Sequence, residues 1–139
     1  MIDTRKKDDE KQQSIKNAVV RLILEEGFQG ASISKIARTA GVSPATVYIY
    51  YENKEAMLQD IYQECTGDAV RYLLDCLRPG MDGEEIIARL VRQYYDYIVR
   101  NREVFYFIEQ FDTCPALCSG CTAMRGTAYL DRMLTELKQ

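Results

Sequence analysis

The sequence contains no histidine and no tryptophan, and it has only three prolines in 139 residues. Without histidine, the chain cannot use a histidine general base, a Ser/His catalytic triad or histidine metal ligands. The glycine-rich signatures of nucleotide-binding loops are also absent. We therefore expect a protein that is not an enzyme and that needs no cofactor.

Long hydrophobic runs are missing as well. No apolar run approaches the roughly 18 residues that a membrane-spanning helix requires. The polar, charged N-terminus does not resemble a signal peptide. We expect a cytoplasmic chain without membrane association, and the five cysteines should then be reduced.

The charge is slightly acidic, with a formal net charge of −3. Residues 1–60 carry nine basic and nine acidic side chains, whereas residues 61–139 carry nine and twelve. The acidic excess thus lies in the second half. Nucleic-acid binding by the first half remains possible, because the local field at a surface matters more than the total charge.

Apolar residues recur at helical spacing along most of the chain, which predicts an all-α fold. Residues 1–11 lack this periodicity and are predicted to be a mobile tail. We expect a DNA-binding domain over residues 12–58 and a helical effector-binding and dimerisation domain over residues 59–139. The predicted helices span residues 12–26, 33–40, 44–51, 54–77, 83–100, 103–111 and 122–138.

Two short helices with a glycine turn between them are marked by local signals. Ser32 can cap the first, and Gly41 follows its end, where a left-handed conformation favours glycine. Ser43 and Pro44 then form a strong start signal for the second. Two helices joined in this way form a helix-turn-helix, whose second helix enters the DNA major groove. An ordinary helical corner is the alternative.

Residues 15–58, IKNAVVRLILEEGFQGASISKIARTAGVSPATVYIYYENKEAML, resemble the DNA-binding domain of TetR/AcrR-type transcriptional regulators. The matching features are Gly27-Phe28 at the end of the first helix, Ala40-Gly41-Val42-Ser43 at the turn, and Tyr48-x-Tyr50-Tyr51. The family usually has phenylalanine at the position of Tyr51. The chain is short for this family, whose members usually continue for two further helices, so the second domain is predicted to be incomplete.

The start of the second short helix carries small side chains that allow close approach to bases, and nearby hydroxyl and ammonium groups suit phosphate contacts. The resemblance implies that several of these positions touch DNA. The predicted DNA-binding residues are Ser32, Ser34, Lys35, Ser43, Pro44, Ala45, Thr46, Tyr48, Tyr50 and Lys54.

Aromatic residues are concentrated in the second half, and together they have the composition of an apolar small-molecule site with a few hydroxyl groups. The resemblance makes an effector pocket plausible, although core packing is the alternative for each aromatic residue. The predicted ligand-binding residues are Tyr62, Tyr94, Tyr97, Phe107 and Phe111.

Cys114, Cys118 and Cys121 form a close C-x3-C-x2-C cluster. Three thiolates can hold zinc or an iron–sulfur cluster if a fourth ligand comes from Cys65, Cys76 or a partner chain, and two of them can form a redox pair. Cysteine is also a small apolar residue that is often simply buried. We predict no metal site and keep the three cysteines as the candidates if one exists.

The sequence therefore predicts a transcriptional regulator that binds double-stranded DNA. We expect a homodimer that represses from a near-palindromic operator and is released by a small-molecule effector. Two alternatives stay open. One is a thiol- or metal-responsive sensor that uses the cysteine cluster, and the other is a truncated interaction protein that does not bind DNA.

Overall fold

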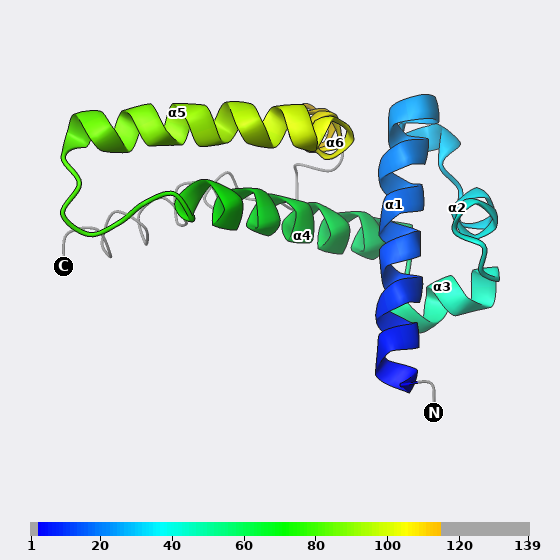
Figure 1. Cartoon of the computed structure of the whole chain (residues 1–139). Coiled ribbons are helices and arrows are strands. Elements are labelled where there is room, and N and C mark those ends of the chain that lie inside the picture. Colours follow the sequence, from blue (N-terminus) through cyan, green and yellow to red (C-terminus); the bar gives the residue numbers. More distant parts are fainter. Residues whose placement is uncertain (1–2, 115–139) are drawn as a thin grey trace.

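The computed structural model describes residues 3–114, which form six helices and no β-strand. The predicted all-α fold is confirmed. Helices α1 to α3 lie at one end of the molecule, and the antiparallel helices α4 and α5 extend away from them (Figure 1). Helix α6 lies beside α1 and α4 and joins the two parts. No helix within residues 3–114 is long and apolar enough to cross a membrane.

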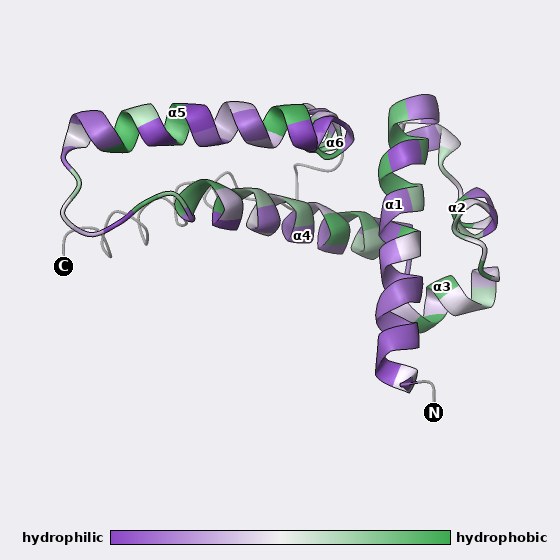
Figure 2. Ribbon diagram, in the orientation of Figure 1, coloured by the Kyte–Doolittle hydropathy of each residue, from purple (hydrophilic) through white to green (hydrophobic). Residues whose placement is uncertain are grey.

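Helix α1 spans Thr4–Gly30 and bends at Gly27, whose φ of 74° is left-handed. Asp3 caps its start by accepting a hydrogen bond of 3.1 Å from the Arg5 backbone N–H. The residues predicted to form a mobile tail are helical from Thr4 onward, and their mobility stays a prediction. These hydrophilic turns (Figure 2) contain no glycine or proline and are rich in good helix formers, so the helix continues beyond its buried part.

The other helices agree closely with the predicted ranges. Helix α2 is Ile33–Ala40, α3 is Pro44–Tyr50 and α4 is Lys54–Leu74. Helix α5 is Gly83–Arg100 and α6 is Arg102–Asp112. The helix predicted over residues 122–138 lies outside the described residues.

One hydrophobic core connects the helix-turn-helix end to α6. Apolar residues of α1 form its centre, and each of α2, α3, α4 and α6 contributes buried side chains. The largest fully buried ones are Phe107, Phe111, Ile15, Ile23, Ile36, Met57, Leu58, Ile61, Val19, Val47 and Cys65. The core therefore runs across the predicted domain boundary at residue 58, and the position of that boundary stays a prediction.

Helices α4 and α5 pack against each other. The rings of Tyr72 and Tyr97 lie 5.6 Å apart, and Gln93 Nε2 donates a hydrogen bond of 2.9 Å to the Tyr72 carbonyl. Apolar residues recur at helical spacing along α5, but within the described residues Ile87 and Val91 are exposed. This spacing alone does not show which apolar residues meet a neighbouring element.

Candidate nucleic-acid interface

Local hydrogen bonds fix the ends of α2 and the start of α3. Ser32 Oγ accepts a hydrogen bond of 3.3 Å from the Lys35 N–H at the start of α2. At the other end Gly41 has a φ of 71°, and its N–H donates to the carbonyls of Ala37 and Arg38. Ser43 Oγ then accepts a hydrogen bond of 3.2 Å from the Thr46 N–H. Because every one of these bonds is local, consecutive residues set where α2 begins and ends and where α3 begins.

Helix α3 has one buried side and one exposed side. Val47 is fully buried, while Pro44, Ala45 and Tyr48 are exposed and Thr46 is half-buried. The Thr46 and Ser43 hydroxyl groups lie 3.0 Å apart and share a hydrogen bond. The residues predicted to contact bases are thus at the surface, and their contacts with DNA stay a prediction.

Ile49 belongs to the same exposed surface, although it is not among the residues predicted to bind DNA. Its side chain is 76% exposed. The sequence does indicate this exposure, because Ile49 comes two residues after Val47 and therefore lies on the opposite side of the helix. Isoleucine is apolar, however, and apolar residues are normally predicted to lie in the core.

Tyr50, at the end of α3, is half-buried and contacts α1. Its hydroxyl group donates a hydrogen bond of 3.1 Å to Asp8 Oδ1. Partial desolvation and this hydrogen bond raise the pKa of Tyr50 above its usual value. The phenol therefore stays protonated at neutral pH, and it has a carboxylate partner where the resemblance implies a phosphate.

The remaining predicted DNA-binding residues lie at helix starts. Ser32 and Ser34 are exposed, and Lys35 pairs with Glu26. Lys54 follows the α4 cap Asn53, and its Nζ atom donates to the backbone carbonyl of Phe28. Because an ammonium group has three donors, this bond leaves two for a phosphate.

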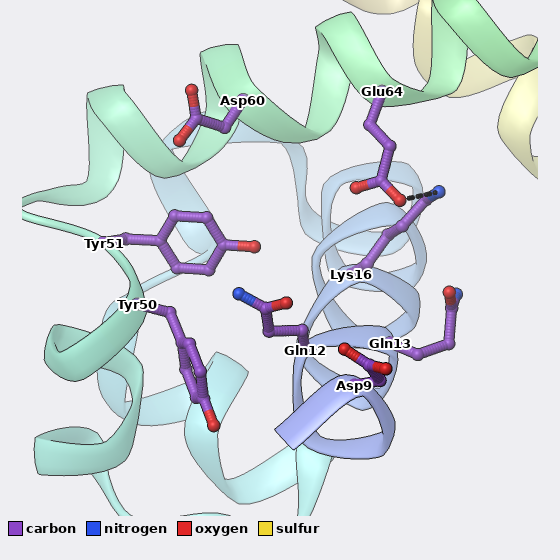
Figure 3. Close-up of a pocket in the computed structure, with 8 residues that line it drawn as sticks. All are labelled: Asp9, Gln12, Gln13, Lys16, Tyr50, Tyr51, Asp60 and Glu64. Atoms are coloured by element: carbon purple, nitrogen blue, oxygen red, sulfur yellow. Dashed lines mark hydrogen bonds and ion pairs between the residues drawn. The ribbon is translucent and has the colours of Figure 1, made fainter. Parts of the chain in front are cut away.

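A polar cavity of about 430 Å³ lies behind α3, between the first half of α1 and the start of α4 (Figure 3). It carries three carboxylates and one ammonium group, so it is acidic. Tyr50 and Tyr51 approach it from the end of α3. Its lining residues are Asp9, Gln12, Gln13, Lys16, Tyr50, Tyr51, Asp60 and Glu64.

Lys16 links α1 to α4 and is only 9% exposed. Its Nζ atom lies 3.0 Å from Glu64 Oε1 and 3.4 Å from Asp68 Oδ2. Burial lowers the pKa of Lys16, but the hydrogen bond to Glu64 and the nearby negative charges outweigh this effect and raise it overall. The ammonium group therefore stays charged at the junction between the helix-turn-helix and the rest of the molecule.

The predicted ligand-binding aromatics do not surround a common space in the described residues. Phe107 and Phe111 are fully buried, and Tyr62 stacks on Phe111 with ring centroids 4.2 Å apart. Tyr94 is 47% exposed on α5. Tyr97 lines a cavity of about 380 Å³, together with Lys16 and Cys65 among others. A role in effector binding stays a prediction for all five.

The cysteine cluster is only partly within the described residues. Cys114 is half-buried, whereas Cys118 and Cys121 lie outside residues 3–114. Among the described residues no group of histidine, cysteine, aspartate and glutamate side chains is arranged to hold a metal ion. Burial raises the pKa of Cys65, a possible fourth ligand, to about 11, so its thiol stays protonated at neutral pH.

Comparisons with known proteins agree with this geometry. The family described as "Bacterial regulatory proteins, tetR family" matches residues 15–61. A TetR family transcription regulator from Marinobacter aquaeolei VT8 has a similar structure, with a TM-score of 0.74 and 32% sequence identity. The match covers 83% of this chain and 62% of that one.

Two curated relatives carry functional names. The fatty acid metabolism regulator protein of Bacillus subtilis is 28% identical over 94 residues, which are 68% of this chain and 48% of that protein. The negative transcriptional regulator IcaR of the biofilm operon icaADBC in Staphylococcus epidermidis is 27% identical over 111 residues, 78% of this chain and 57% of that protein. The chain thus spans about half the length of these relatives.

Proposed function

Because residues 15–61 belong to the tetR family of bacterial regulatory proteins, we propose that this chain is a transcriptional regulator that binds double-stranded DNA through α3. The observation that carries the proposal is the two-sided character of α3. Val47 anchors the helix in the core, and the small side chains of Pro44 and Ala45 stand at the surface. Such a helix can enter a major groove without steric hindrance.

The proposed contacts are of two kinds. Thr46 and Ala45 face base edges, whereas Tyr48 and Lys54 bind phosphates and fix the position of α3. The helix-turn-helix is short and reads few base pairs. Two copies on a near-palindromic operator therefore give the selectivity that one copy lacks.

The proposed direction of regulation is repression, which a small-molecule effector relieves. The name of the Staphylococcus epidermidis relative, a negative regulator, supports repression. The continuous core from α1 to α6 supports a link between the two halves, since a ligand among the distal helices can shift α1 through shared packing. Relief requires that the effector bind the two conformations with different affinity.

The direct test is DNA binding by the purified chain. Fragments selected from random duplexes should converge on a related pair of half-sites. Fluorescence anisotropy with the selected duplex should give an affinity that falls linearly with log salt concentration, because bound phosphates release counterions. Absence of selection together with equal, weak binding to all duplexes would overturn the proposal.

A further inference from the structure

Ile49 projects from α3 directly away from the protein. Successive residues of an α-helix are about 100° apart, so Ile49 lies roughly 200° around the helix from Val47. Val47 is fully buried and Ile49 is the most exposed large hydrophobic residue of the described chain, at 76%. The centre of the exposed side of α3 is therefore occupied by a branched apolar side chain.

The residues around Ile49 leave it accessible. Ala45 lies one turn earlier on the same side and presents a single methyl group, because positions four apart are neighbours on a helix. Tyr48 is 55% exposed and lies nearer the edge of this side. Isoleucine brings no advantage to a short solvated helix, since β-branched residues lose side-chain freedom there. Its position on the exposed side of a helix proposed to enter a major groove gives it an apolar partner there, the methyl group of a base.

We propose that Ile49 determines base specificity by packing against the C5-methyl group of a thymine in the major groove, an inference that rests on the proposed DNA-binding function. Thymine is the only base that presents an apolar group at the major-groove edge. Ala45 leaves room for the base beside it. The prediction is that each half-site of the selected operator contains a thymine at the position facing Ile49.

The experiment compares thymine with deoxyuridine, which lacks only the C5-methyl group. Each thymine of the selected operator is replaced in turn, and affinity is measured by anisotropy at constant salt. The affinity of the wild-type chain should fall about fivefold when one particular thymine of a half-site is replaced by deoxyuridine, because one methyl contact is lost. The Ile49→Ala variant should bind the thymine operator with an affinity lower than that of the wild-type chain by a similar factor. Replacing the same thymine by deoxyuridine should not lower the affinity of this variant further.

Ile87→Ala is the matched control, because Ile87 is 66% exposed and lies on α5, outside the helix-turn-helix. Its affinity for the thymine operator and for the deoxyuridine operator should equal that of the wild-type chain. If Ile49→Ala and the wild-type chain lose affinity equally on every deoxyuridine substitution, Ile49 does not contact a thymine methyl group and the inference is wrong. If the wild-type chain binds no duplex with salt-sensitive affinity, the proposed function itself fails.

Discussion

The hydroxyl group of Tyr50, at the end of α3, donates a hydrogen bond of 3.1 Å to Asp8 Oδ1 in the second turn of α1. The two residues are 42 positions apart in the sequence. The Asp8 carboxylate thus accepts the hydrogen bond that Tyr50 is predicted to donate to a DNA phosphate. Its negative charge also repels a phosphate that approaches Tyr50. The charge of Asp8 therefore lies beside a hydroxyl group that is predicted to contact DNA.

We expect Asp8→Asn to strengthen binding to all duplexes, because it removes this negative charge and keeps a polar partner for Tyr50. The gain should be about threefold at low salt and should fade as salt screens the charge. Anisotropy titrations at several salt concentrations measure it. Asp75→Asn, at the far end of α4, is the control and should have no effect. Unchanged or weaker binding by the Asp8 variant would contradict the assignment.

Lys54→Ala should weaken binding to every duplex by a similar factor and reduce the salt slope by about one per bound copy. The change also leaves the Phe28 carbonyl without its donor, which should lower the free energy of unfolding by about 1 kcal/mol. Urea unfolding in the absence of DNA measures this loss of stability separately from the loss of DNA affinity. Lys54→Arg is the control, and it should retain most of the salt slope.

Thr46→Ala should instead relax base preference, because Thr46 offers a hydroxyl and a methyl group to base edges. Affinity for the selected operator should fall while affinity for unrelated duplexes stays constant. Competition between the operator and duplexes with single base changes provides the measurement. If Thr46→Ala and Lys54→Ala weaken binding equally on all sequences, the division into base and phosphate contacts is wrong.

The buried ammonium group of Lys16 should depend on its two carboxylate partners. Glu64→Gln combined with Asp68→Asn should lower the free energy of unfolding by about 1 to 2 kcal/mol, because the largely buried ammonium group then lacks a counter-charge, while both carboxylates are half-exposed. Adding Lys16→Met should recover most of this loss, since no charge remains to be buried. Urea denaturation of the two variants gives the comparison. A triple variant that is no more stable than the double variant would show that the charge of Lys16 is not responsible.

The raised pKa of Cys65 predicts a loss of stability at high pH. Burial raises this pKa from 9.0 to about 11 in the folded chain. Between these values the unfolded chain binds fewer protons than the folded one, so stability falls as pH rises. The loss should be about 2 kcal/mol between pH 9 and 11. Urea unfolding between pH 9 and 11 gives the slope of the free energy of unfolding against pH. This slope should be smaller for Cys65→Ala than for the wild-type chain, and identical slopes would show that the thiol does not cause the loss of stability.

Local signals in the sequence determined the helix-turn-helix. Helix α2 has the predicted bounds and α3 differs by one residue at its end, because Ser32, Gly41 and Ser43 act through hydrogen bonds to residues at most four positions away. The resemblance of residues 15–58 to a regulator family rests on these same residues and is confirmed by the family match. Interactions of such short range are encoded in consecutive residues.

The tertiary structure decided which side chains meet. Lys16 contacts Glu64 across 48 positions, and Lys54 contacts the Phe28 carbonyl across 26. The apolar spacing of α5 predicts burial of Ile87, yet no described element covers it. Ile49 has the chemistry of a core residue and the position of a surface one. Burial depends on what packs against a side chain, and that partner comes from a distant part of the chain that periodicity does not identify.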